Sequence, residues 1–313
     1  MQCELSLYNN SLLKRSNREF CFKGLINTFL KTKDLKLTSE QSYRSSFTQF
    51  AEYLKKRSII EPTEQTIKEF KQYLVDKKLS VFTVISHISA LKSLFTFLET
   101  RNLYPNISKD IKTPKKPKGF MRDSLTKEQA RNLLDACKGD DEVIAVRDYA
   151  IISTLLRCGL RSIEIIRSDV GDIRKCNGAY VLWVHGKGRD SKDEFVVLTH
   201  EALKAIKNYL FLRGNPIEHE PLFVSHGPRN KQGRLTTRSI RRMVKARLKD
   251  IGIDEKELSC HSLRHTFATI ALANSASLLA VQKAMRHSNI NTTTIYTHMI
   301  DRLTDGAESF IDI

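Results

Sequence analysis

Cysteine is scarce in this sequence, and no two cysteines are close enough to form a C-x-x-C motif. The six cysteines are dispersed along the chain, at Cys3, Cys21, Cys137, Cys158, Cys176 and Cys260. No secretory leader is recognisable, so we expect reduced thiols rather than disulfide bonds. Long apolar runs are also missing, since no segment approaches the roughly 20 apolar residues that cross a bilayer. These absences predict a cytoplasmic protein without a membrane partner.

The sequence also lacks the motifs of a nucleotide-dependent or metal-dependent enzyme. It contains no G-x-x-x-x-G-K-[ST] loop to hold a nucleotide's phosphates, and no acidic cluster of the kind that binds two metal ions. We therefore expect no cofactor and no metal.

Acidic residues are too few to balance the basic ones. Asp and Glu total 35, Lys and Arg total 52, and the formal net charge is +17, spread along the chain. A strongly basic folded protein most often binds a polyanion, usually nucleic acid. From charge alone, a ribosome-associated factor or an enzyme of anionic metabolites stays open. In a prokaryote, a DNA-binding protein of this kind would associate with the nucleoid.

The 313 residues indicate about two domains. Residues 1–111 show helical periodicity, and the first 20 or so are predicted to form an extra arm. Three apolar stripes mark the expected core: Tyr43, Phe47, Phe50 and Leu54; Ile67, Phe70 and Leu74 after a Thr63 cap; Val84, Ile88, Leu91, Phe95 and Leu98. The opposite faces, which include Arg44, His87 and Lys92, are predicted to face solvent or DNA phosphates.

A basic segment separates this helical part from the rest. Residues 112–119 read KTPKKPKG, whose two prolines and glycine cannot continue a helix. We predict a linker over 112–122, with Lys115 and Lys116 as candidates for contact with DNA. Thr126 and Gln129 are spaced as a capping box that begins a helix in the second domain, residues 123–313.

The second domain is predicted to mix helices with a small β-sheet. Helical patterns cover 143–168, 200–213, 236–250, 262–274 and 276–286. Residues 179–200, AYVLWVHGKGRDSKDEFVVLTH, contain two β-rich runs around a basic turn, which is typical of a hairpin with a long tip. The fold class is therefore mainly α with a small β-sheet.

Five short motifs in this domain carry possible chemistry. In chain order they are RCGLRSIEI, with Arg161 and Glu164; GKGRDSK, with Lys187; HSLRHTFAT, with His261 and Arg264; MRHSN, with His287; and TTIYTHM, with Tyr296. Taken in order, they resemble the tyrosine recombinases, the phage-type integrase family, in its Xer-like or mobile-element branch. Tyr296 follows His287 by nine residues, as in that family. Arg286 departs from it, because a glycine usually precedes this histidine.

The resemblance implies a SAM-like helical core-binding domain, a mixed catalytic domain and a site-specific recombinase. Tyr296 would be the nucleophile that forms a 3′-phosphotyrosyl bond. Arg161 and Arg264 would hold the phosphate, since guanidinium groups offer forked donors that stay charged. Lys187 would protonate the leaving oxygen, with Lys192 as the alternative donor.

The remaining site residues would assist these groups. His261 would accept the tyrosine proton or hold a phosphate oxygen, and His287 would donate to the phosphate. Glu164 would orient Arg161 or cap the local backbone. The tail, residues 301–313, would dock in a neighbouring protomer or fold back on its own domain. The resemblance also implies a homo-tetramer on two paired DNA sites, with a related recombinase or accessory protein as a possible partner.

Other interpretations of the same residues are weaker. A zinc site would use Cys260, His261 and His265, but it lacks a fourth ligand, and adjacent residues rarely chelate one ion.

The helix over 236–250 carries four candidates for DNA contact: Arg238, Arg241, Arg242 and Lys245. A type IB topoisomerase would use similar chemistry. A catalytically silent DNA-binding regulator is disfavoured because each of the five motifs contains the residue that would carry out its part of the chemistry.

Overall fold

The computed structural model describes residues 18–115, 124–138, 142–186, 191–287 and 293–294. Two compact units divide the chain, Met1–Phe120 and Met121–Ile313. The expected arm and the exact bounds of the linker stay predictions.

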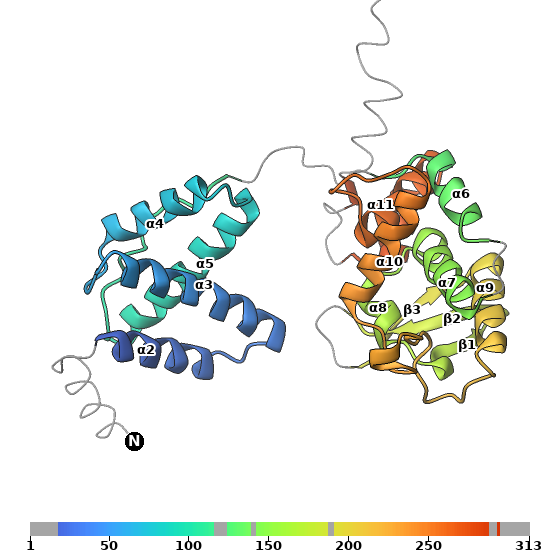
Figure 1. The fold of residues 1–313 in the computed structure, drawn as a ribbon, viewed down its shortest axis with the longest axis horizontal. Helices are drawn as coiled ribbons and strands as arrows, with labels where there is room; N and C mark the ends of the chain where they lie inside the picture. The colour runs from blue at the N-terminus through green and yellow to red at the C-terminus, as the bar shows by residue number, and fades with distance from the viewer. Residues whose placement is uncertain (1–17, 116–123, 139–141, 187–190, 288–292, 295–313) are drawn as a thin grey trace, which may run out of the picture. The chain divides into compact units, whose positions relative to one another are not determined.

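The described part of the first unit, residues 18–115, contains four helices (Figure 1): α2 (Arg18–Thr32), α3 (Leu37–Lys56), α4 (Glu64–Asp76) and α5 (Val81–Thr100). α5 packs against the other three. The predicted stripes are confirmed, since all their members are buried except Tyr43, which is half-buried. Aromatic rings meet edge to face in this core, as with Phe50 and Phe70 at 4.9 Å between centroids. Thr63 caps α4 as expected.

Two expectations for this unit were wrong. His87 is buried rather than solvent-facing, and burial lowers the pKa of its imidazole. α5 has the length and hydropathy of a membrane-spanning helix, although the sequence was expected to contain no such segment. Nine of its residues are buried in the core of the helical unit. A buried core helix can have the same length and hydropathy, so these two properties of α5 are weak evidence for a membrane span.

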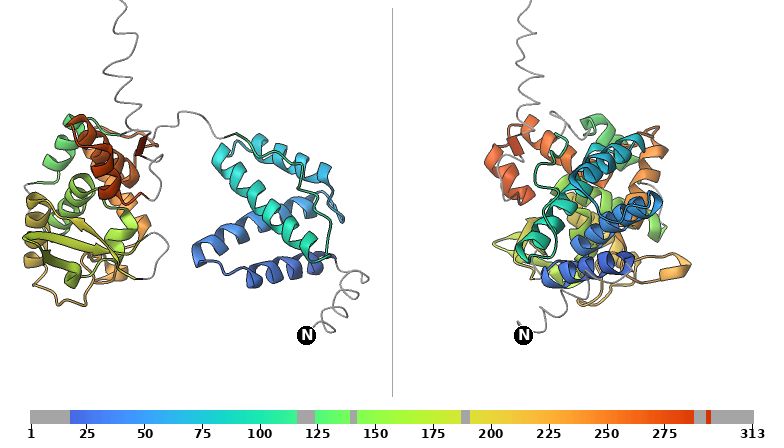
Figure 2. Two further views of the ribbon diagram at one scale, coloured as in Figure 1. Left: turned by 180° about the vertical axis from the view of Figure 1, so that it is seen from behind. Right: turned by 90° about the vertical axis from the view of Figure 1, so that its left-hand side faces the viewer.

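In the second unit, the long helix α7 (Val143–Cys158) packs against α6 (Lys127–Asp135), α9 (His200–Leu212) and α11 (Cys260–Ala273). The left view in Figure 2 shows the helices of this unit beside the small sheet. The other helices among the described residues of this unit are α8 (Ser162–Arg167), α10 (Thr237–Asp250) and α12 (Leu278–Met285), with short 3₁₀ turns η1 (Val170–Asp172) and η2 (Pro228–Asn230). The capping box at Thr126 and Gln129 is confirmed.

The sheet contains the predicted hairpin and one further strand. β1 (Ile173–Cys176), β2 (Ala179–Val184) and β3 (Glu194–Val197) are antiparallel in the order β1-β2-β3. The last pair in the β2–β3 register is Val184 with Glu194, so the hairpin tip begins there. Residues 187–190 of the tip lie outside the described part of the chain.

The helix expected over 143–168 is instead two helices. Gly159 ends α7 in the left-handed conformation, with φ of 61°. Arg161 is then extended, and α8 begins at Ser162. This break turns the backbone between the two helices, and it places Arg161 at the N-cap of α8 rather than inside a helix.

Candidate active site

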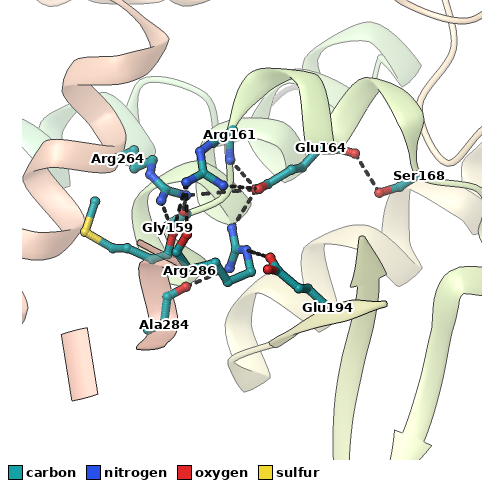
Figure 3. Close-up of polar contacts among 9 residues, drawn as sticks. Gly159, Arg161, Glu164, Ser168, Glu194, Arg264, Ala284 and Arg286 are labelled. Atoms are coloured by element: carbon teal, nitrogen blue, oxygen red, sulfur yellow. Dashed lines mark hydrogen bonds and ion pairs between the residues drawn. The ribbon is translucent and has the colours of Figure 1, made fainter. Parts of the chain in front are cut away.

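Glu164 is the centre of the candidate site (Figure 3). Its side chain is buried and accepts from three nitrogens: the backbone N–H of Arg161 (2.7 Å), Nη1 of Arg161 (2.7 Å) and Nη2 of Arg286 (2.6 Å). Arg264 Nη1 lies 3.9 Å from the same carboxylate. Glu164 therefore both caps the backbone at Arg161 and orients its guanidinium, the two roles that the sequence left open.

Arg161 and Arg264 converge on one backbone segment, although they are 103 residues apart. Arg161 Nη2 donates to the carbonyls of Met285 (3.4 Å) and Arg286 (3.3 Å), and Arg264 Nη2 also donates to Met285 O. These carbonyls end α12, next to His287. The two arginines predicted to hold a phosphate thus come together beside the predicted histidine.

Gly159 allows α11 to approach α7 closely enough for this arrangement. Its carbonyl accepts from Arg264 Nη1 at 2.5 Å. A Cβ on Gly159 would lie 2.6 Å from Cδ1 of Phe267 on α11. Together with its positive φ, this close approach requires glycine at position 159.

Arg286 is a third arginine in the site, and the sequence indicated only that it replaces a usual glycine. It has φ of 53° and ψ of 48°, a conformation that costs a non-glycine residue about 1–2 kcal/mol. Its side chain is 5% exposed and pairs with Glu164 at 2.6 Å. A buried, charge-assisted pair of this length offsets the backbone strain. Three guanidinium groups therefore share one buried carboxylate, and this excess of positive charge favours an anion.

His287 is held by two residues that the sequence analysis missed. Its Nδ1 lies 3.0 Å from the hydroxyl of Thr293, and its backbone N–H donates to Gln282 O at 3.1 Å. Thr293 is fully buried and precedes Tyr296 by three residues. No spacing rule in the sequence indicates this contact. Tyr296 itself, and the tail at 301–313, lie outside the described residues.

The two histidines of the HSLRH motif lie in the first turns of α11. His261 is exposed, whereas His265 is half-buried. His261 and the buried Arg264 are three apart in one helix, as the sequence predicted, so they share a face. Within the described residues, no group of three or more His, Cys, Asp or Glu side chains is arranged to hold a metal ion, so the zinc interpretation has no ligand set there.

Lys192 is tied to carboxylates at the base of the hairpin. Its Nζ lies 2.8 Å from Asp169 and 2.5 Å from Asp172. Burial lowers the pKa of Lys192, but the two carboxylates outweigh burial and raise it. Asp169 is also paired with Arg234 at 2.5 Å. Lys192 therefore holds the base of the hairpin in place, and it releases its proton less readily than an ordinary lysine. Lys187, the preferred donor, lies outside the described residues.

The DNA-contact candidates of the first unit make only weak contacts of their own. Arg44 is exposed and pairs with Glu40 at 2.7 Å within α3. Lys92 is half-buried and donates to Lys109 O at 3.5 Å, while Lys115 is exposed. Lys116 lies outside the described residues. Exposed pairs of this type contribute little to stability, so these side chains can exchange them for phosphates. Their contact with DNA stays a prediction.

The candidates on α10 differ from one another. Arg238, Arg241 and Arg242 are exposed, whereas Lys245 is half-buried and donates to Glu255 O. Burial raises the pKa of the Cys260 thiol to about 11, and the charge of Arg241 acts against this rise. The three exposed arginines can reach a DNA backbone more readily than the half-buried Lys245, and their contact with DNA stays a prediction.

Both units match known protein families. Residues 123–302 match the phage integrase family, and residues 25–104 match the phage integrase N-terminal SAM-like domain. Among curated relatives, the tyrosine recombinase XerC of Natranaerobius thermophilus is 36% identical over 76% of this chain and 79% of its own length. The tyrosine recombinase XerD of Rickettsia conorii is 28% identical over 88% of this chain and 94% of its own length.

Solved structures show the same fold. The XerH site-specific recombinase bound to a palindromic difH substrate has a TM-score of 0.74, with 24% identity, and the match covers 92% of this chain and 84% of that one. The Tn1549 transposon integrase in complex with circular intermediate DNA has a TM-score of 0.69 at 19% identity, covering 93% and 99%. The fold class predicted from the sequence is confirmed. The chain therefore belongs to the phage integrase family and is a tyrosine recombinase, a site-specific enzyme that cuts and rejoins DNA.

Proposed function

We propose that this recombinase cuts each DNA strand through a 3′-phosphotyrosyl bond to Tyr296. The proposal rests on one observation: the guanidinium groups of Arg161, Arg264 and Arg286 surround the buried carboxylate of Glu164. Cleavage of a phosphodiester builds negative charge on the non-bridging oxygens, and preorganised cations in a site with little water stabilise it strongly. Arg161 and Arg264 hold those oxygens in this proposal.

The proposed reaction needs one proton to leave the tyrosine and one to reach the DNA. The Tyr296 oxygen forms a bond to phosphorus as the bond from phosphorus to the 5′ oxygen breaks. His261 takes the phenol proton, and Lys187 gives a proton to the leaving 5′ oxygen. His287 donates to a phosphate oxygen while Thr293 fixes its ring. The 5′ hydroxyl of a partner strand then attacks the phosphotyrosine and reverses these steps.

We infer that the active form is a homo-tetramer on two paired DNA sites, with a related recombinase or accessory protein as a possible addition. The relatives XerC and XerD are named as tyrosine recombinases, and the XerH and Tn1549 enzymes were solved with their DNA. The protein would act in the cytoplasm, at the nucleoid of a prokaryotic host. A type IB topoisomerase-like activity and a silent DNA-binding regulator are the alternatives.

A nicked suicide substrate separates these functions. The DNA site is first enriched from a random pool by binding to the protein, and a nick is then placed beside the cleavage position. Loss of the short fragment beyond the nick traps the covalent complex. An adduct supports an enzyme, and its absence favours the regulator. Joining of two such sites then favours a recombinase, whereas relaxation of supercoiled plasmid without joining favours a topoisomerase.

Adduct formation should continue in excess EDTA. In the proposed reaction the arginines supply the positive charge, and the phosphotyrosyl bond keeps the energy of the phosphodiester for rejoining. Neither step calls for a metal ion or ATP. The suicide assay is run after prolonged incubation with EDTA, with untreated protein as the control. Loss of adduct that zinc or magnesium restores would contradict the proposal.

Arg241→Ala should weaken DNA binding mainly at low salt. If Arg241 contacts one phosphate, its loss removes one released counterion, and the slope of log K against log salt should become shallower by about 0.9. Lys204→Ala, which removes an equal charge from an exposed position on α9, is the matched control and should leave the slope nearly unchanged. Equal slopes for Arg241→Ala and the wild type would show that Arg241 does not contact the DNA backbone.

A further inference from the structure

Arg286 contacts carboxylates from two different parts of the catalytic unit. Its Nη2 pairs with Glu164 at 2.6 Å, and its Nε faces Glu194 Oε2 at 3.8 Å. Glu164 belongs to the arginine site, by which we mean Arg161, Arg264 and Arg286 around its carboxylate. Glu194 is the first residue of β3. We propose that Arg286 is a positioning residue that connects the β2–β3 hairpin to the arginine site, and so sets where the hairpin presents its lysine donor. This inference rests on the proposed function.

The contact between Arg286 and Glu194 is incomplete. Among the described residues, neither Arg286 Nε nor Glu194 Oε2 has a hydrogen-bond partner, although both atoms are buried. A charge-assisted N–H···O bond is about 2.7–2.9 Å long, so a shift of about 1 Å would close the gap. Figure 3 shows the two groups facing each other beside Glu164. A buried, unpaired donor and acceptor favour the closed arrangement.

The position of Glu194 makes this contact relevant to the hairpin tip. Glu194 pairs with Val184 across the register, at the point where the two strands separate into the tip. Lys187 follows Val184 by three residues. Movement of Glu194 toward Arg286 therefore draws the base of the hairpin toward the arginine site. Lys192, two residues before Glu194 on the same arm of the hairpin, holds Asp169 and Asp172.

Arg286 does not act as a phosphate ligand in this proposal. Its side chain is 95% buried and already donates to Glu164 and to Ala284 O at 2.6 Å. Its loss leaves Glu164 with Arg161 and Arg264, so the buried carboxylate keeps positive partners. A change at Glu194 keeps all three guanidinium groups, so its effect on catalysis should come through the proton donor. This separates Arg286 from the two arginines that would hold the phosphate.

The test uses two suicide substrates, one with an ordinary phosphodiester and one with a sulfur at the 5′ bridging position. A thiolate leaves without a proton, so it removes the need for the lysine donor. Glu194→Gln, Arg286→Gly and the double variant are compared with the wild type. Arg286→Lys tests whether the charge alone suffices. Glu220→Gln is the matched control, because it neutralises a carboxylate that pairs with Arg213 rather than with Arg286.

Glu194→Gln and Arg286→Gly should each slow cleavage of the ordinary substrate about 10- to 100-fold, the usual penalty of a small displacement in a catalytic group. The sulfur substrate should bring Glu194→Gln within about threefold of the wild type, whereas Arg286→Gly, which also removes one of the three guanidinium groups, should recover only in part. The double variant should be no slower than the slower single variant, since both changes break one contact. Arg286→Lys should recover part of the rate, and Glu220→Gln should match the wild type.

Several results would overturn the proposal. Wild-type rates for Glu194→Gln on both substrates would show that the contact has no role. Equal slowing on both substrates would place the effect on phosphate binding or folding instead of proton donation. Glu194→Gln keeps every Arg286–Glu164 contact, so it decides the question even if Arg286→Gly folds poorly. If the wild type forms no adduct with either substrate, the proposed function fails, and this inference fails with it.

Discussion

Tyr296→Phe should bind DNA as tightly as the wild type and form no covalent adduct. The change removes one oxygen atom and leaves the ring, so binding surfaces and packing are preserved. A phenol has a pKa of about 10 and is a weak nucleophile alone, but neighbouring cations favour the phenolate. Arg161, Arg264 and Arg286, which come together beside His287, supply such cations. Gel shift measures binding, and a denaturing gel measures the adduct on the suicide substrate.

Tyr180→Phe is the matched control for this experiment. Tyr180 lies in β2, and its ring is covered by Lys207 Nζ at 4.8 Å from the centroid. This variant should form the adduct at the wild-type rate. An adduct that survives Tyr296→Phe and maps by mass spectrometry to another tyrosine, such as Tyr180, would rule out Tyr296 as the nucleophile. The nine-residue spacing from His287 would then have no catalytic meaning.

Local features were predictable from the sequence because their causes are local. The cap at Thr63 and the capping box at Thr126 each depend on two residues three apart. The pair of Arg161 and Glu164 has the same separation, so its contact follows from the start of one helix. Apolar stripes predicted the buried faces of α3, α4 and α5 for the same reason.

Features that depend on distant segments were not predictable in this way. Arg286 reaches Glu164 across 122 residues of sequence, and no spacing rule connects them. His87 appeared polar enough to face solvent, but α5 packs against three helices and is buried on that side too. The continuous pattern over 143–168 concealed the break at Gly159, because apolar residues follow on both sides of the turn.

The two lysines of the hairpin show how charge pairing can separate residues that look equivalent. Both lie in the GKGRDSK motif, and the sequence left Lys192 as an alternative proton donor. Lys192 is held by Asp169 and Asp172, which raise its pKa against the opposing effect of burial. A general acid works best when its pKa is near the working pH. Lys192 is therefore poorly suited to the role, which favours Lys187.

Lys187→Ala should slow cleavage of the ordinary phosphodiester by about 100-fold or more, the usual contribution of a general acid. On the 5′-bridging sulfur substrate its rate should return to within about threefold of the wild type, because a thiolate leaves without a proton. Single-turnover cleavage of the two substrates measures both effects. Binding, followed by gel shift, should change little.

Lys192→Ala provides the contrast, because it removes an equal charge from the same hairpin. It leaves Asp169 with Arg234, but Asp172 loses its lysine partner and keeps the Asp169 backbone N–H at 2.7 Å. The variant should therefore have a lower melting temperature and a looser hairpin. If Lys187 is the donor, the sulfur substrate brings the cleavage rate of Lys187→Ala to within about threefold of the wild type, and this variant keeps the wild-type melting temperature. If instead Lys192→Ala is slower on the ordinary substrate and is the one that sulfur rescues, the two roles are reversed. Equal slowing of Lys187→Ala on both substrates would show that Lys187 binds the phosphate rather than protonating the leaving oxygen.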